Sequence, residues 1–263
     1  MLLIAFDRQR FNRSIEMVAY ARTVLEQPDH QNCDTSDTLV LATFGSLEAR
    51  LRRLSHDLMP KVPASTKGHI SDDGDQWLMT VNDIEDPQNL LASCCMTLTN
   101  VLGANQNLEA TSLGDSFEVE SGRNASVFLT ISPFKCFDKA KAHRAQGLLW
   151  QAISRFCLLQ NVDYVIGSLA FNSRYPAAHA LELSYLYHFC RSQSEVHLRA
   201  AHGVTMDIMP EEAIKPDEVF SSLPPMLRYC LRVGAKVADN VVVDRASNET
   251  RIFLLFPAKK IIG

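Results

Sequence analysis

The sequence predicts a layered domain of the α/β or α+β class, in which helices pack on a sheet. Segments rich in β-branched and aromatic residues recur along the chain and predict strands. Between residues 125 and 171 a strand, an amphipathic helix and another strand follow one another, which is typical of a crossover between parallel strands. Because 46% of the 263 residues are hydrophobic and 21% are charged, the chain can bury a sizeable core.

Charge and cysteine content narrow the class of protein. The net charge of −4 argues against nucleic-acid binding, so local basic patches must carry any anion binding. The 7 cysteines show no CxxC or CxxH spacing, which predicts reduced, mostly buried thiols and no metal site. The opening MLLIAF is too short for a signal peptide, and no apolar run approaches the length of a membrane span. We therefore expect a cytoplasmic protein, with attachment to a membrane surface left open.

The first half of the chain is expected to open with an N-terminal extension over residues 1–40, in which an amphipathic helical segment precedes a polar connector. Glycine, proline and polar residues then separate short apolar segments. The elements expected here are a strand over 38–45, a helix over 47–59, a hairpin of strands 76–83 and 90–103, and an irregular polar stretch over 103–124.

The second half is expected to hold the crossover and a helical segment. Pro133 lies inside the strand candidate 125–137 and cannot donate to a ladder, so we expect a bulge or an edge there. The remaining elements expected are a helix over 144–160, a buried strand over 162–171, a helix over 177–191, two short helices within 209–237, and paired strands in NVVVD and TRIFLLF.

A basic turn leads into the helix of the crossover. Its cationic side chains are Lys135, Lys139, Lys141, His143 and Arg144. Arg144-Ala-Gln146-Gly147 fits the pattern Arg/Gln-x-x-Gly-x-small, apart from the last position. Backbone N–H groups at a helix N-terminus favour a phosphate, and Gly147 would let that phosphate approach closely. We call this candidate phosphate site at Arg144–Gly147 the cradle. The alternative is an ordinary exposed turn whose basic side chains are solvated.

Four stretches of the second half form a recognisable set. They are LLWQAI, VDYVIGSLAF, AHALELSYLYHF and SLPPMLRYCLRVGAKV followed by VVVD. With them the chain resembles the bacterial ornithine-lipid N-acyltransferases, a hemolysin-like branch of the GNAT superfamily related to the acyl-homoserine lactone synthases. The resemblance is good from about Ser132 onward, fainter from Gly45 and absent for residues 1–40. It implies a GNAT-like acyltransferase domain over 41–263, with a central mixed, mostly antiparallel sheet flanked by helices.

The resemblance also implies a reaction and its partners. A fatty acyl group would pass from the phosphopantetheine thioester of acyl carrier protein, or from acyl-CoA, to the amine of an amino acid such as ornithine. Because the amine attacks directly in a ternary complex, no permanently bound cofactor, metal or covalent nucleophile is expected. An acidic carrier protein would dock on the basic turn, with Arg228, Arg232 and Lys236 as further candidates. Peripheral contact with the inner face of the cell membrane is a further expectation.

Individual residues are assigned to donor and acceptor on the same grounds. Those assigned to the donor are Lys135, Cys136, Lys141, Arg144, Gln146 and Gly147, and those assigned to the acceptor are Ser168, Phe171 and Arg174. Arg174 follows a buried strand, where sites gather in α/β sheets, and could bind a carboxylate. An ordinary polar loop is its alternative. Cys136 could also be a nucleophile activated by its basic neighbours, although a buried structural thiol is the simpler interpretation.

One stretch departs from the family pattern. The family carries Glu-Leu-Gly-Arg-Ser-Cys before the cradle, whereas this chain has Thr130-Ile-Ser-Pro-Phe-Lys-Cys136 and keeps only the cysteine. The general base must then come from elsewhere, and the candidates are His179 with Glu182, which share a helix face, and the loop acid Glu118. Surface polar residues are the alternative interpretation of each. A relative that binds donor, acyl chain or membrane without turnover is the rival function, and a short-chain acetyltransferase is a third.

Overall fold

The structure is a computed structural model, which describes residues 38–54, 75–102, 105–110, 113, 115–121, 125–192 and 196–262. The expected extension over 1–40 lies outside these ranges except for its last three residues, which open the first strand. The division of the chain at residue 41 stays a prediction.

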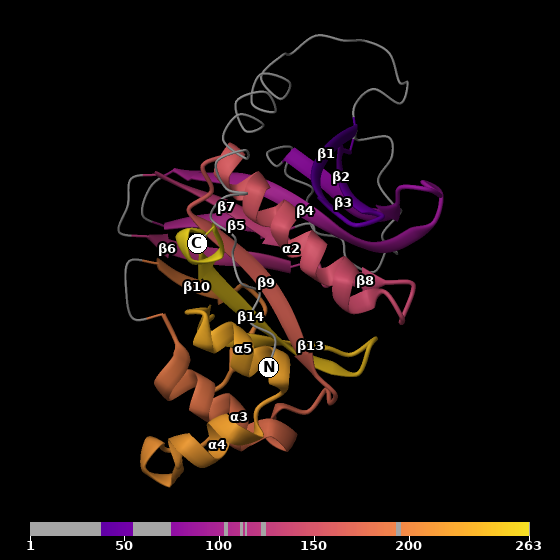
Figure 1. Cartoon of the computed structure of the whole chain (residues 1–263). Helices are drawn as coiled ribbons and strands as arrows, with labels where there is room; N and C mark the ends of the chain where they lie inside the picture. The colour runs from indigo at the N-terminus through magenta and orange to yellow at the C-terminus, as the bar shows by residue number, and fades with distance from the viewer. Residues whose placement is uncertain are drawn as a thin grey trace.

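A large mixed sheet forms the centre of the described structure (Figure 1). Its strands, in spatial order, are β1 (Thr38–Phe44), β2 (Leu47–Arg53), β3 (Asp75–Asp83), β4 (Leu90–Leu102), β7 (Ala125–Ile131), β9 (Tyr164–Phe171), β14 (Glu249–Pro257), β13 (Asn240–Asp244) and β11 (Val204–Thr205). Two short strands join it from the side, namely β8 (Lys135–Cys136) on β4 and β12 (Lys236–Val237) on β14. The ladder between β7 and β9 is parallel and the other ladders between described strands are antiparallel.

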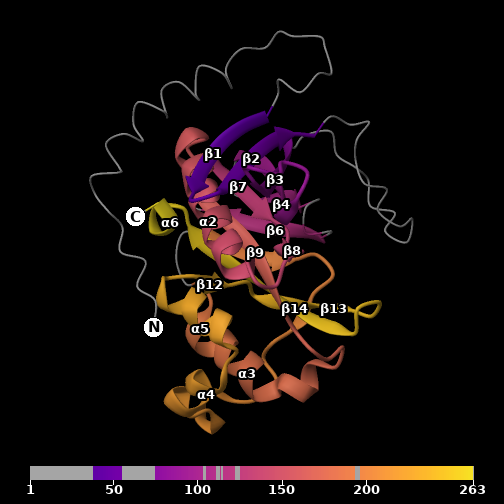
Figure 2. The same cartoon turned by 45° about the vertical axis from the view of Figure 1, so that its right-hand side comes forward.

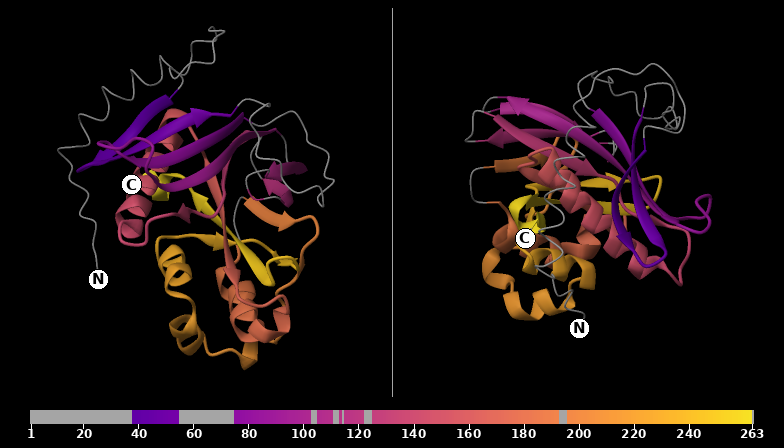
Figure 3. Two further views of the ribbon diagram at one scale, coloured as in Figure 1. Left: turned by 90° about the vertical axis from the view of Figure 1, so that its right-hand side faces the viewer. Right: turned by 45° about the horizontal axis from the view of Figure 1, so that its top comes forward.

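Each face of this sheet carries its own layer. Helix α2 (Ala142–Leu159) lies along one face, as Figure 1 shows, and buries Leu149, Ile153 and Phe156 against it. A second sheet of β10 (Val196–Ala200), β6 (Asp115–Ser121) and β5 (Asn105–Ala110) covers the other face (Figure 3). A mixed, mostly antiparallel sheet flanked by helices is therefore confirmed, and the arrangement is consistent with a GNAT-like fold.

Strand β14 explains why the two layers form on a single sheet. Its side chains point alternately to the two faces, so Ile252 and Leu254 join the core under α2, while Phe253 and Leu255 join the core under the small sheet. A strand buried on both faces reads as a continuous apolar run, which is what IFLLF is.

A helical region packs at one end of the main sheet (Figure 2). It consists of the 3₁₀ turns η2 (Pro176–His179) and η4 (Glu211–Ala213), the π turn η3 (Leu186–Cys190), and the helices α3 (Ala180–Tyr185), α4 (Pro216–Ser222) and α5 (Pro225–Arg232). The two short helices are confirmed as α4 and α5. The single helix expected over 177–191 is instead three consecutive turns of different pitch. The chain ends in α6 (Lys259–Ile262).

The helix expected over 47–59 is wrong for its first half, which is strand β2, whereas 55–59 lie outside the described residues. Leu47 and Leu51 are four residues apart, a spacing that suits a helix as well as a strand. Gly45 decides between them, because its φ of 60° lets the chain turn back from β1 at once. Leu47, Ala49 and Leu51 then alternate into the core.

The polar stretch expected over 103–124 is also wrong, since most of it forms the antiparallel hairpin of β5 and β6. Phe117 and Val119 are buried, and Glu118 and Glu120 alternate with them on the exposed face. Only one face of the small sheet is covered, so every second residue of its strands is exposed and polar. These polar residues made the stretch look irregular in the sequence.

The irregularity expected at Pro133 is confirmed. Ile131 pairs with Met96, but Lys135 pairs with Ser93, so this chain has one more residue than β4 between the two pairs. Within the break, the Ser132 hydroxyl accepts a hydrogen bond from the Cys95 N–H at 2.9 Å. The side chain thus satisfies a backbone group that a regular ladder would have paired.

The prediction of mostly buried, reduced thiols is confirmed for the described cysteines, since Cys94, Cys157, Cys190 and Cys230 are buried, Cys95 and Cys136 are half-buried, and all are free. Burial raises the pKa of the Cys157 thiol to about 12 and that of Cys230 to about 11. Such thiols stay protonated and unreactive near neutral pH.

Asn240 ties the two sheets together and gives a first prediction. Its buried side chain accepts from the Ala200 N–H at 2.8 Å and donates to the Ala200 carbonyl at 2.9 Å. Asn240→Ala leaves both backbone groups unpaired, so we expect the free energy of unfolding to fall by about 2 kcal/mol. Urea denaturation measures this, with Asn172→Ala at an exposed position as the control. Equal losses in the two variants would contradict this role of Asn240.

Candidate functional site

The parallel ladder between β7 and β9 is short, and this opens the centre of the sheet. It holds three pairs, from Phe128 with Tyr164 to Thr130 with Ile166. Strand β9 continues to Phe171, paired only with β14 among the described strands. Strand β7 instead ends at Ile131, and the next N–H group, that of Ser132, donates to the Cys95 carbonyl of β4. Beyond Ile166, β9 therefore has no strand partner on the side toward β7, and we call this separation of the two strands the split. Polar groups of a ligand can pair with the backbone of β9 there.

The first turn of α2 begins where the short strand β8 ends. The carboxylate of Asp138 accepts from the N–H groups of Ala140 and Lys141, at 2.8 and 3.3 Å, and the helical ladder starts with Ala145 donating to the Lys141 carbonyl at 2.9 Å. No backbone carbonyl of the described chain accepts a hydrogen bond from the N–H groups of residues 142–144, which lie between them. They remain available to an anion, as at other helix N-termini.

The helix starts two residues before the expected Arg144, which corrects the position of the cradle. Gly147 is the sixth residue of α2 and lies in its second turn, so its N–H is inside the ladder. The available N–H groups come from Ala142, His143 and Arg144. What Gly147 supplies is space, because a Cβ built there would meet no atom within 4 Å.

This space matters because nothing in the described protein requires a glycine at position 147. A glycine inside a helix costs about 1 kcal/mol relative to alanine. The residue has ordinary helical geometry and no crowding neighbour. A glycine here leaves room for a group to approach the helix closely at this point.

The basic side chains of the turn divide into two sets. Lys141 is paired with Asp83 at 2.9 Å, and its hydrogen bond holds the pKa of that carboxyl below its usual value. It therefore ties the start of α2 to the end of β3. Lys135, Lys139 and Arg144 are exposed and pair with no acid among the described residues.

Two further donor candidates hold the turn together. The Gln146 amide lies 3.4 Å from the sulfur of Cys136 and joins α2 to β8. Both side chains are half-buried. This contact favours a structural thiol over a nucleophile at Cys136, because the amide of Gln146 cannot act as a base.

The acceptor candidates cluster at the far end of β9. Phe171 is buried, and the His179 ring stacks on it with the ring centres 4.6 Å apart. The Nε2 atom of His179 is buried without a partner in the described structure. Ser168 is half-buried on the same strand. Arg174 is exposed and donates to the Tyr175 hydroxyl at 2.8 Å, so its guanidinium is held at the surface.

The proposed bases are not brought together. Glu182 is half-buried on α3, and no hydrogen bond joins it to His179 in the described chain. Glu118 lies in β6 rather than in the expected loop, opposite Arg199 and exposed on the outer face of the small sheet. That sheet covers the face of the main sheet opposite α2, so Glu118 is separated from the cradle by the main sheet.

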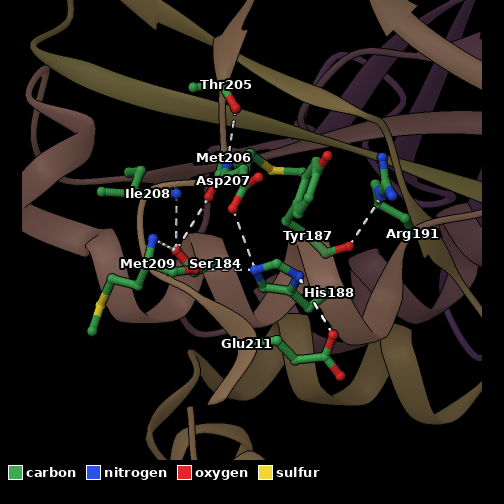
Figure 4. Close-up of polar contacts among 10 residues, drawn as sticks. All are labelled: Ser184, Tyr187, His188, Arg191, Thr205, Met206, Asp207, Ile208, Met209 and Glu211. Atoms are coloured by element: carbon green, nitrogen blue, oxygen red, sulfur yellow. Dashed lines mark hydrogen bonds and ion pairs between the residues drawn. The ribbon is translucent and has the colours of Figure 1, made fainter. Parts of the chain in front are cut away.

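Sequence reasoning missed Ser184 and the role of His188 (Figure 4). The Ser184 hydroxyl is fully buried and accepts from the N–H groups of Ile208 and Met209, at 3.2 and 2.9 Å. His188 lies 3.0 Å from the Met209 carbonyl and 3.3 Å from Asp207. Both residues fasten the loop before η4 onto the helical region that carries His179. Their partners lie more than 18 residues further along the chain, so no local pattern could reveal them.

Ser184 gives a second prediction. Ser184→Ala removes the acceptor of two backbone N–H groups, and we expect the free energy of unfolding to fall by about 1–3 kcal/mol. The matched control is Ser221→Ala, whose exposed hydroxyl donates only to the Asp217 carbonyl of its own helix. Thermal unfolding of both variants checks this, and an unchanged Tm for Ser184→Ala would contradict it.

Comparison with known proteins shows what the chain is similar to. The chain is 37% identical over 123 residues to the L-ornithine N(alpha)-acyltransferase of Brucella abortus, which is 46% of this chain and 44% of that protein. It is 38% identical over 125 residues to the protein of that name from Rhizobium meliloti, or 47% and 42% of the two chains. The chain thus spans less than half the length of these relatives. No protein-family model matches it.

Proposed function

We propose that this chain is an N-acyltransferase that moves a fatty acyl group from a thioester to the amine of an amino acid. The names of its relatives support N-acyl transfer and make ornithine the first acceptor to test. The observation that carries the proposal is Gly147, because a Cβ built there would meet no atom within 4 Å and the residue lies one turn after the N–H groups at the start of α2.

The donor would bind at the start of α2. Its phosphate accepts hydrogen bonds from the N–H groups of Ala142, His143 and Arg144, with Gly147 leaving room for the pantetheine arm. Lys135, Lys139 and Arg144 surround this point with positive charge. Acyl carrier protein is preferred over CoA as the donor, because a cluster of exposed cations steers an acidic protein surface.

The acyl transfer itself needs few groups. The amine nitrogen attacks the thioester carbonyl, the oxyanion forms, and the thiolate leaves as the amide forms. The backbone of β9 beyond Ile166, unpaired on the side of the split, would donate to the oxyanion. A base must take a proton from the amine, and His179 suits this task better than Glu118 because its buried Nε2 has no other described partner. Glu182 and Arg174 would assist from α3 and the β9 loop.

A binder without turnover is the second candidate, and one observation favours it. Between Thr130 and Cys136 the chain has no acid, and Thr130 is fully buried. This is the stretch where the family carries Glu and Arg. Such a relative would keep the cradle and lose the chemistry.

Turnover separates the two candidates and forms the third prediction. We expect the purified chain, incubated with a long-chain acyl carrier protein and ornithine, to release thiol and form an N-acyl product visible by mass spectrometry. Acetyl-CoA in place of the long-chain donor tests the short-chain alternative. His179→Gln should lower kcat by about 100-fold or more, within the range of general-base effects, while Glu118→Gln serves as the matched control. If the chain binds carrier protein but forms no product, the binder without turnover becomes the favoured function in place of the acyltransferase.

Gly147 gives the fourth prediction, which both candidates share. Gly147→Ala should raise the free energy of unfolding by about 1 kcal/mol, because its Cβ meets nothing in the protein and helix propensity improves. The same methyl group should weaken donor binding, seen as a higher KM for acyl carrier protein. Gln151→Ala, exposed one turn later on α2, is the control for both readouts. If Gly147→Ala is stabilised but its affinity for the donor is unchanged, the donor does not bind at this position.

A further inference from the structure

Helix α5 presents an outward face that is both apolar and basic. Met226 and Tyr229 are 47% and 61% exposed, although both are large apolar side chains. Met226, Tyr229 and Arg232 are three residues apart in succession and project to one side of the helix, whereas Leu227 and Cys230 are buried. Half-buried Arg228 lies at the edge of that side, one turn before Arg232. The outward side therefore combines Met226 and Tyr229 with Arg228 and Arg232.

Three lysines extend this face. Lys236 is exposed in β12, directly after the turn that ends α5, and Lys259 and Lys260 are exposed in α6. The Lys260 stem passes 3.8 Å from the point where a Cβ on Gly234 would lie, which brings α6 against the end of α5. We call the set Met226, Arg228, Tyr229, Arg232, Lys236, Lys259 and Lys260 the α5–α6 surface. Its cations form no ion pair with a described acid, although the chain carries a net charge of −4.

The α6 end of the α5–α6 surface lies away from the start of α2. The Ala258 N–H donates to the Asp163 carbonyl, so α6 begins where α2 has just ended. Figure 1 shows α2 running from β8 toward the C-terminus. The 18 residues of α2 place its two ends about 27 Å apart.

We propose that the α5–α6 surface binds the anionic face of a lipid bilayer. Exposed methionine and tyrosine side chains surrounded by arginine and lysine suit the headgroup region, where the apolar parts enter and the cations meet lipid phosphates. An acidic carrier protein is the less suitable occupant, since on the proposed function its phosphopantetheine must reach the opposite end of α2. Among the described residues no helix has the length and apolar character of a membrane span, so the contact proposed is peripheral.

The test is sedimentation of the full chain with vesicles, without donor or acceptor. We expect binding to vesicles of phosphatidylcholine with phosphatidylglycerol, and loss of that binding with phosphatidylcholine alone or in high salt. Because the assay involves no acyl transfer, its failure is distinguishable from failure of the proposed activity.

Variants locate the contact. Lys259→Glu with Lys260→Glu should weaken binding at least about tenfold. The matched control is Arg199→Glu with Arg245→Glu, which makes the same charge change at exposed positions in β10 and in the β13–β14 turn. Tyr229→Ser should also weaken binding, and it keeps the proposal testable if the double variant misfolds.

Several outcomes would overturn the proposal. They are no binding to anionic vesicles, equal binding to both vesicle types, and equal weakening by the control pair. Binding of acyl carrier protein that is lost in Lys259→Glu with Lys260→Glu would assign the surface to the carrier protein instead.

Discussion

The parallel ladder of three pairs between β7 and β9 is the constraint on which the candidate site depends. At its closed end the two strands are held firmly, because Asp163 exchanges backbone and side-chain hydrogen bonds with Val127 at 2.9 Å. At its other end β7 stops at Ile131, and a proline two residues later cannot donate to β9. The two strands are therefore held together at one end and part beyond Thr130 and Ile166. The position of Pro133 in the sequence contributes to the split, in addition to packing.

The interruption also determines where α2 begins. Ser132 and β8 return the chain to β4, so the helix starts beside β4 and crosses the face of the sheet to reach β9. Lys141 and Asp83 fix that starting point from the β3 side, and Gln146 with Cys136 fixes it from β8. The free N–H groups of α2 thus lie near the opening by connectivity. The candidate anion site at the start of α2 and the split between β7 and β9 thus belong to the same β7–α2–β9 crossover.

Much of this fold was predictable because its signals are local. The crossover, the β3–β4 hairpin and the irregularity at Pro133 follow from apolar runs and one missing N–H group. Errors arose where a spacing fits both a helix and a strand, as with Leu47 and Leu51. They also arose where polar residues on an exposed face obscure the alternation of buried and exposed residues in a strand, as in β6. The site is less readable, since stacking of His179 on Phe171 and the contacts of Ser184 are tertiary. Gly147 was identified from its sequence motif. The start of α2 was placed two residues late, because the sequence does not show that Asp138 accepts from the Ala140 N–H in the turn just before the helix.

The buried state of Thr130 bears on how catalysis would proceed. Its side chain is inaccessible and donates to the Thr97 carbonyl at 3.4 Å, between the core and the small sheet. An ionised carboxylate at this position would be buried without a cation, which costs several kcal/mol. The sequence around the end of β7 is thus adapted to packing rather than to proton transfer. On the proposed function, the base is sought instead at the far end of β9, where the His179 ring stacks on Phe171 and its Nε2 atom is buried. The proposed base would then lie on β9's side of the split, and the proposed donor site at the start of α2.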